Sequence, residues 1–121
     1  MKTPAREIMT TDLITLPENS TIEEAIKVLM NGKITGLPVT NEKGRLVGVL
    51  SEYDILEQVA QHKKVKAEHF QEKVKFSPQV DAIQDHVTLE EILERFVKSK
   101  FRRLPVIDHE EKLVGIITRR D

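Results

Sequence analysis

An internal repeat constrains the fold of this chain more than any other feature of its sequence. When the sequence is shifted by 67 residues, positions 15–54 align with positions 82–121 without a gap, and 11 of the 40 aligned pairs are identical. Most of the other pairs keep their polarity. A copy of about 40 residues is too short to bury a core alone, so we expect two copies that pack together.

Each copy predicts a helix near its start. Thr21 and Thr88 stand three residues before Glu24 and Glu91, which is the spacing of a helix capping box. Apolar residues then recur at the helical period and define one buried face. Gly32 is placed to end the first helix. A further helix is expected to begin near Asp54.

Two short apolar runs follow each predicted helix. They cover residues 37–39, 46–50, 104–107 and 113–117. Turn residues separate the runs, so we expect a β-hairpin in each copy. Gly44 and Glu111 occupy the turn position that favours a positive φ, and the second turn is therefore expected to be strained. One more strand is expected before each helix, at residues 13–16 and 80–83.

The fold class that follows is α+β, with two strand–helix–strand–strand repeats packed sheet to sheet about an approximate two-fold axis. We divide the chain into a first repeat with the N-terminal segment, residues 1–62, a charged connector, residues 63–75, and a second repeat, residues 76–121. The connector is rich in lysine, and its role is left open between a solvated linker and a basic docking surface. The chain ends before a last helix of the second repeat, so it can be a piece of a longer protein.

Composition excludes several classes of function. The net charge of −1 gives no overall field for nucleic acid or an acidic membrane, and the absence of cysteine excludes disulfides and thiolate metal sites. No segment has the length of a signal peptide or a membrane span, so we expect a cytoplasmic chain that does not enter a membrane. The four histidines are scattered and no catalytic motif is present, so we expect neither an enzyme nor a metal site.

The repeated pattern resembles a tandem pair of CBS domains, the Bateman module. The resemblance covers roughly residues 5–121 and rests on a capped helix, Leu-Pro-Val, and Leu-Val-Gly-aliphatic-aliphatic-Ser/Thr-x-x-Asp, each present twice and in register. It implies a non-catalytic module that senses adenine nucleotides in the cleft between the copies. The ligand expected is AMP, ADP or ATP, or S-adenosylmethionine, with no required cofactor. It also implies a homodimer, whose geometry signals whether ligand is bound, and a regulated partner protein or attached domain.

The chemistry of the repeated Ser/Thr-x-x-Asp agrees with such a ligand. A carboxylate can accept hydrogen bonds from both hydroxyls of a ribose. A hydroxyl three residues earlier can reach the same ligand if a strand turns into a helix there. The amides at that helix start are expected to be free, which favours a phosphate.

The family pattern then places two sites on the chain. The first site is expected at Asp54, Ser51, Val49, Thr35, Gly36 and Ser77, with Asp81 beside it. The second site is expected at Asp121, Thr118, Ile116, Arg102, Arg103, Arg120, Thr10 and Ile14. The aspartates are expected to hold ribose, and the aliphatic residues are expected to line the base pocket.

The two sites are expected to differ in charge. The second repeat carries Arg102, Arg103, Arg119 and Arg120 where the first carries Thr35, Gly36, Glu52 and Tyr53. Guanidinium groups pair with phosphate oxygens, so the second site is expected to take the more anionic ligand. The first site is expected to take a less charged adenosyl group or nothing.

Other interpretations of the same residues remain open at this point. In one of them, Asp54 and Asp121 are simple helix N-caps, a position that aspartate favours, and they bind no ligand. The whole chain can be a structural dimerisation module that binds no ligand. Binding of nucleic acid through the connector lysines and the four arginines is a third interpretation, and the net charge argues against it.

Overall fold

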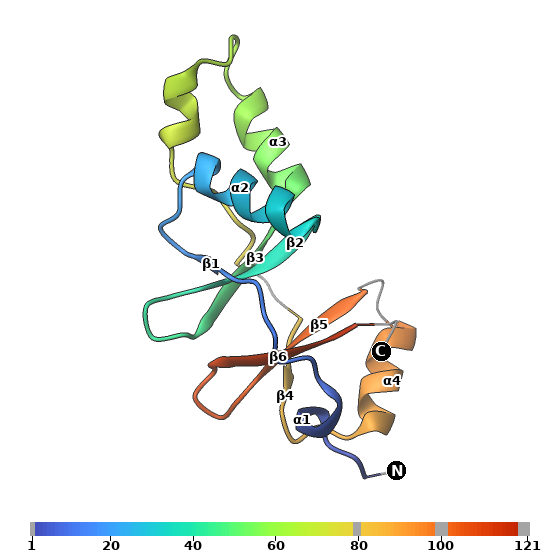
Figure 1. The fold of residues 1–121 in the computed structure, drawn as a ribbon. Coiled ribbons are helices and arrows are strands. Elements are labelled where there is room, and N and C mark those ends of the chain that lie inside the picture. The colour runs from blue at the N-terminus through green and yellow to red at the C-terminus, as the bar shows by residue number, and fades with distance from the viewer. Residues whose placement is uncertain (1, 79–80, 99–101, 119–121) are drawn as a thin grey trace. The chain divides into compact units, whose positions relative to one another are not determined.

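The computed structural model describes residues 2–78, 81–98 and 102–118, which form two compact units (Figure 1). One unit is Ile14–Val80 and the other combines Met1–Leu13 with Asp81–Asp121. The N-terminal residues, which the sequence analysis grouped with the first repeat, are thus grouped by the structure with the second repeat. The reason is packing: Ala5 is fully buried in the core of the second repeat, and Met9 packs against that core.

The first unit is a three-stranded sheet with two α-helices. Its elements are β1 (Leu16–Pro17), α2 (Ile22–Gly32), β2 (Gly36–Thr40), β3 (Leu46–Ser51), α3 (Glu52–Ala60) and the 3-10 helix η1 (Ala67–Gln71). The strand order is β1-β2-β3, with β1 parallel and β3 antiparallel to β2. The predicted hairpin and the predicted helix near Asp54 are both present.

The second unit repeats this arrangement. Its elements are α1 (Ala5–Ile8), β4 (Ile83–Gln84), α4 (Leu89–Lys98), β5 (Arg103–Ile107) and β6 (Leu113–Thr118). The order β4-β5-β6 has the same strand directions as the first sheet. Each strand begins and ends 67 residues after its counterpart, which confirms the repeat and the α+β class.

The first strand of each repeat is shorter than expected and begins later. The sequence analysis placed these strands at residues 13–16 and 80–83. Leu16 pairs with Val39 in parallel register, so an earlier residue would pair with Pro38. Because proline has no amide hydrogen, it cannot donate to that ladder, and β1 is limited to two residues.

The capping box predicted for the first helix is present. The amide of Glu24 donates to Oγ1 of Thr21 at 3.2 Å, and the amide of Thr21 donates to Oε1 of Glu24 at 3.0 Å. The helix ends at Gly32, as predicted, although Lys33 takes the left-handed conformation with φ +52°. Ser99, the counterpart of Gly32, lies outside the described residues.

The hairpin turns of the two repeats have equivalent hydrogen bonds, which a side-chain amide accepts in the first repeat and a carboxylate accepts in the second. Gly44 has φ +80° and Glu111 has φ +66°, so both positions are left-handed as predicted. Oδ1 of Asn41 accepts the amides two and four residues ahead at 2.9 and 3.0 Å. Oδ1 of Asp108 accepts the equivalent amides at 2.8 and 3.0 Å. These bonds hold the turn and help it to accommodate a glutamate in the left-handed region.

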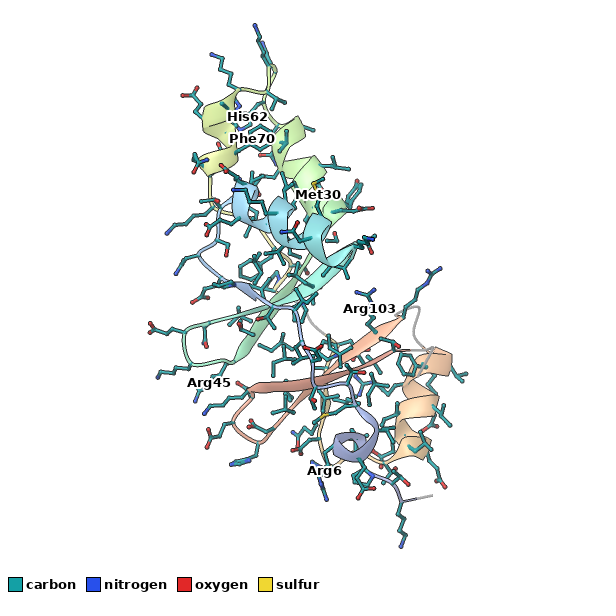
Figure 2. All side chains as sticks on the ribbon, in the orientation of Figure 1. Arg6, Met30, Arg45, His62, Phe70 and Arg103 are labelled. Atoms are coloured by element: carbon teal, nitrogen blue, oxygen red, sulfur yellow. The ribbon has the colours of Figure 1, made fainter. Side chains whose placement is uncertain are left out.

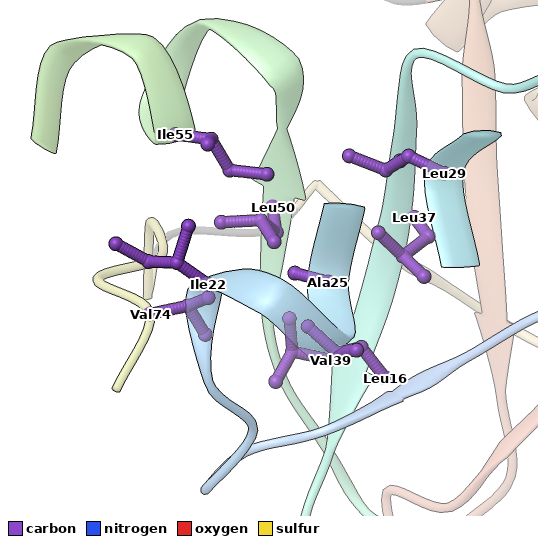
Figure 3. Close-up of a cluster of buried hydrophobic side chains, with 9 residues drawn as sticks. All are labelled: Leu16, Ile22, Ala25, Leu29, Leu37, Val39, Leu50, Ile55 and Val74. Atoms are coloured by element: carbon purple, nitrogen blue, oxygen red, sulfur yellow. The ribbon is translucent and has the colours of Figure 1, made fainter. Parts of the chain in front are cut away.

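Each unit has its own apolar core. In the first unit α2 and α3 cover the sheet, and the buried cluster includes residues from both helices and from β2 and β3 (Figures 1 and 3). Its buried members are Leu16, Ile22, Ala25, Leu29, Leu37, Val39, Leu50, Ile55 and Val74. The buried cluster of the second unit contains Ala5, Ile83, Ile92, Leu104, Val106 and Ile117.

The charged connector folds back on the first repeat. Val74 is only 6% exposed and belongs to the core cluster. Its amide donates to the Ser20 carbonyl at 2.9 Å, and the amide of Ile22 donates to the Glu72 carbonyl at 2.9 Å. The end of the connector is therefore a structural part of the first unit and more than a solvated linker.

In the portion of the chain that the structure describes, no helix combines the length and the apolar character that a membrane crossing needs.

Candidate functional site

The core of the first site lies where β3 passes directly into α3. Ser51 is the last residue of β3 and the N-cap of α3. Its amide donates to Oδ2 of Asp54 at 2.9 Å, and its Oγ accepts the Asp54 amide at 3.2 Å. The strand-to-helix turn expected from the sequence is present. Asp54 is the third helical residue of a capping box and is not itself the N-cap.

The helix start at this site has fewer free amides than the sequence analysis expected. The amide of Glu52 donates to the Thr35 carbonyl at 2.8 Å. The amide of Asp54 is bonded to Ser51 within the capping box. The expectation of free amides is thus wrong for these two residues, because the Glu52 amide joins the helix to the residue before β2 and the Asp54 amide closes the capping box. A phosphate at this helix start would have to compete with those bonds.

The remaining residues expected at the first site lie around this junction, within the same unit. Gly36 is paired with Ser51 across β2 and β3. Ser77 pairs with Val49: the Val49 amide donates to the Ser77 carbonyl at 2.9 Å, and the Ser77 amide donates back at 3.0 Å. A Cβ at Gly36 would lie 3.2 Å from the Leu50 carbonyl oxygen, so this corner has little room for a side chain.

The second repeat reproduces the backbone of this site. Arg103 is paired with Thr118 across β5 and β6, as Gly36 is paired with Ser51. The Thr10 amide donates to the Ile116 carbonyl at 2.8 Å, and the Ile116 amide donates to the Thr10 carbonyl at 3.0 Å. The segment before each repeat therefore pairs with the hairpin of the other repeat, at equivalent positions.

Only some of the other residues expected at the second site belong to the part of the chain that the structure describes. Arg103 is exposed at the start of β5 (Figure 2), and the preceding Arg102 is also exposed. Arg120 and Asp121 lie outside the described residues, as does Arg119. Ile14 belongs to the other compact unit and is 44% exposed.

Asp81 has a partner that the sequence analysis did not foresee. Its carboxylate pairs with Nη2 of Arg95 on α4, and the same nitrogen lies 3.4 Å from the Ala82 carbonyl oxygen. The equivalent residues in the first repeat are Ile14 and Val28, which are apolar. This ion pair lies within the second unit, and the expected role of Asp81 beside the first site stays a prediction.

The sequence analysis did not identify two groups of polar residues on and after α3. Gln58 is buried, at 4% exposure, and its side chain bonds to the backbone at Lys73 and Lys75. His62, two residues after the end of α3, stacks on His69 with ring centroids 3.5 Å apart. Gln58 and His62 are four residues apart on or next to α3, so helical spacing could have indicated that they share a face.

The His62 ring also contacts a carboxylate. Its Nε2 lies 3.1 to 3.2 Å from the Glu72 carboxylate oxygens, and this hydrogen bond lowers the pKa of Glu72. Among the described residues, no group of histidine and acidic side chains has the geometry to hold a metal ion. The His62–Glu72 contact joins the residues that follow α3 and η1, and the candidate first site is formed by β3, α3 and the segment that ends at Ser77.

Comparison with known proteins places this geometry in context. A family model described as the CBS domain matches residues 5–61 and 74–121. The chain is 35% identical over 117 residues to an inosine-5'-monophosphate dehydrogenase of Methanocaldococcus jannaschii, a match that covers 97% of this chain and 22% of that protein. The chain spans only 22%, 41% and 23% of the length of the first three curated relatives it matches.

Solved structures of similar chains contain adenosyl ligands. The structure of CBSX2, a CBS-pair protein from Arabidopsis thaliana, in complex with AMP has a TM-score of 0.78 and 32% identity, covering 98% of this chain and 91% of that one. The CBS domain pair of protein MJ0100, in complex with 5'-methylthioadenosine and S-adenosyl-L-methionine, has a TM-score of 0.73 and 28% identity. That match covers 99% of this chain and 92% of the other.

Proposed function

Since the chain belongs to the CBS domain family and carries two copies of the domain, we propose that it is a regulatory module that binds an adenine nucleotide or a related adenosyl compound. The module performs no catalytic step of its own in this proposal. The ligand stabilises the arrangement of the module for which it has the higher affinity, and a partner protein or an attached domain responds to that arrangement.

The observation that carries the proposal is that the ends of β3 and β6 have equivalent structures, each paired with a segment that precedes the other repeat. In each repeat a hydroxyl residue ends the second hairpin strand, at Ser51 and Thr118, and a flanking segment pairs two residues earlier. Asp54 is held at this corner by a capping box that uses Oδ2. A carboxylate has roughly four acceptor positions, so Asp54 can both cap the helix and accept ribose hydroxyls.

The two sites of this proposal take ligands of different charge. The second site has Arg102 and Arg103 at the start of β5, and the ordinary partner of such groups is phosphate. The first site has Gly36 in place of Arg103, and its helix-start amides at Glu52 and Asp54 are engaged. We therefore assign AMP, ADP or ATP to the second site. S-adenosylmethionine or a similar compound without phosphate is assigned to the first site.

Isothermal titration calorimetry of the chain with AMP, ADP, ATP and S-adenosylmethionine tests the proposal. At least one of these ligands should bind at micromolar concentration and raise the melting temperature, because it binds only the folded chain. The absence of both heat and thermal shift with all four ligands, at high micromolar concentration, would contradict the proposal.

A second candidate function is dimerisation, which exposed apolar side chains on the helices favour. Met30 on α2 is 72% exposed (Figure 2), and Val97, at the equivalent position on α4, is 84% exposed. Tyr53 and Leu56 on α3 are 68% and 65% exposed. We propose that these side chains are covered by a second copy of the chain, because single soluble domains seldom expose this many large apolar side chains in register.

Sedimentation equilibrium of the wild type and of Met30→Lys and Val97→Lys tests this second candidate. A wild-type dimer that either substitution converts to monomers is the expected result. A wild type that stays monomeric at tens of micromolar (roughly the range where weak dimers form) would exclude it. The dimer and ligand-binding proposals are independent, so each can fail without the other.

A further inference from the structure

The two units anchor their flanking segments in the same way at one end. The amide of Val74 donates to the Ser20 carbonyl at 2.9 Å, and the amide of Ala5 donates to the Val87 carbonyl at 2.8 Å. Ser20 and Val87 are equivalent residues of the repeat, so Val74 and Ala5 are equivalent anchors. Both anchors are buried in the core of their unit.

The segments differ between this anchor and the site. In the second unit five residues lead from Ala5 to Thr10, and they include the helical turn α1, in which the Met9 amide donates to the Ala5 carbonyl at 2.9 Å. In the first unit only three residues lead from Val74 to Ser77. Three residues cannot close a helical turn, which needs about four, so the groups of this backbone need partners from elsewhere.

Gln58 supplies partners to this shorter segment. Its Nε2 donates to the Lys73 carbonyl at 2.9 Å, and its Oε1 accepts the Lys75 amide at 2.8 Å. A carboxamide carries one donor side and one acceptor side, as a peptide group does. The Gln58 side chain thus bonds one edge of the segment as a neighbouring strand would. Residues 20–22 bond the other edge through the Val74 amide and the Glu72 carbonyl.

We infer that Gln58 is a positioning residue for the first site: its buried side chain holds residues 73–75 so that Ser77 pairs with Val49. The same helix carries Asp54 at its start, one turn before Gln58. Helix α3 therefore carries the Asp54 carboxylate and, through the Gln58 side chain, also holds the flanking segment of the first site. The second unit achieves the same pairing with α1.

Native-state hydrogen exchange of Gln58→Met tests the backbone part of this inference. Methionine fills the same volume without the two hydrogen bonds. The Val49 and Ser77 amides should exchange about tenfold faster or more, because the segment loses two buried bonds. The Thr10 and Ile116 amides, which make the equivalent pair in the other unit, should keep their wild-type rates. Unchanged rates at Val49 and Ser77 would overturn the inference.

Gln71→Met is the matched control, since it removes the same functional group from the same unit. Nε2 of Gln71 donates to Oε2 of Glu23 at 2.5 Å and so joins η1 to α2. Equal acceleration of the Ser77 amide in Gln71→Met and Gln58→Met would show general loosening and would overturn the specific role. If Gln58→Met does not fold, Gln58→Glu keeps an acceptor for the Lys75 amide, and a smaller acceleration at Ser77 is expected.

Binding tests the remaining part, which rests on the proposed function because it takes Val49 and Ser77 as ligand contacts. Calorimetry with S-adenosylmethionine should give about tenfold weaker binding to Gln58→Met and wild-type binding to Gln71→Met. Calorimetry with ATP, assigned to the second site, should be unchanged by either substitution. Faster exchange with unchanged S-adenosylmethionine affinity would refute the role of Gln58 in the site. If the wild type binds neither ligand, the proposed function fails, while the exchange result still decides the backbone role.

Discussion

The two repeats of this chain share a backbone and differ in the charges placed on it. Every described strand of one repeat recurs 67 residues later in the other with the same pairing, including the irregularity between Val39 and Thr40 and between Val106 and Ile107. At the hairpin end, however, Gly36 is replaced by Arg103. The comparison indicates that core and turn positions preserve the fold, while a strand-end position differs in charge between the repeats; under the proposed function, this difference changes what each site binds.

The second difference lies in how each site is bordered. Gly48 lies under Phe76 and the Ser77 carbonyl, whereas Gly115 lies under the side chain of Met9. Both glycines are needed because a flanking segment crosses the hairpin closely at that point. One segment presents backbone and an aromatic ring to its glycine, and the other presents a flexible side chain, so the two sites should differ in how they respond to added volume.

The largest effect is expected from alanine at these two glycines. A Cβ at Gly48 would meet the Ser77 carbonyl and the Phe76 ring closer than real Cβ atoms approach any neighbour. We expect Gly48→Ala to lose about 3 kcal/mol of unfolding free energy, at the upper end of typical overpacking costs. Gly115→Ala should lose about 1–2 kcal/mol, because Met9 can move aside. Urea denaturation measures both, and equal losses would remove this difference between the repeats.

The next effect concerns the charge of the second site. Arg103→Ala should weaken binding of ATP and ADP at least tenfold (about 1.5–3 kcal/mol for a charge-assisted bond) and change adenosine binding by less than about twofold. Arg45→Ala is the matched control, because Arg45 is also exposed but lies at the first hairpin turn (Figure 2). Equal weakening of adenosine and ATP by Arg103→Ala would refute the assignment of the anionic ligand to this site.

A smaller effect is expected from pH at the two hairpin turns. The backbone amides of Lys112 and, to a lesser extent, Glu110 lower the pKa of Asp108, whereas the equivalent Asn41 does not titrate. A carboxyl with a lowered folded-state pKa stabilises the fold above its unfolded pKa of about 3.9, and that contribution is lost as the pH falls through the folded pKa.

Reciprocal substitutions separate this turn from the other acidic groups of the chain. Asp108→Asn should reduce the loss of thermal stability between about pH 5 and pH 3, and Asn41→Asp should increase it. Melting temperatures measured by circular dichroism across that range decide the matter. An acid sensitivity that is the same in the wild type and in both variants would show that the turn carboxylate contributes nothing.

Much of the fold could be predicted because each repeat contains capping and turn residues that mark where its helices and hairpins begin and end. The capping box at Thr21, the left-handed positions at Gly44 and Glu111, and both hairpins follow from residues close in sequence. The first strands were placed too early because the effect of Pro38 depends on a parallel pairing that no local pattern reveals.

Part of the local geometry at the candidate site could be predicted, whereas most of its hydrogen bonds could not, and the ligand-binding role of its residues stays a prediction. Ser51 and Asp54 were identified from their spacing, and the pairing of Ser77 with Val49 agrees with their expected proximity. The engagement of the helix-start amides, the pairing of Asp81 with Arg95, and the burial of Gln58 all depend on tertiary contacts. Such contacts lie far apart in sequence, so composition and periodicity cannot indicate them.

The most direct test is a two-dimensional amide NMR titration of the chain with ATP. If equivalent backbones carry sites of unequal charge, the amides of Thr10, Ile116 and Thr118 should shift at lower ATP concentration than those of Val49, Ser51 and Ser77. Shifts that appear first, or equally, in the Val49, Ser51 and Ser77 group would contradict the account, as would the absence of shifts in both groups.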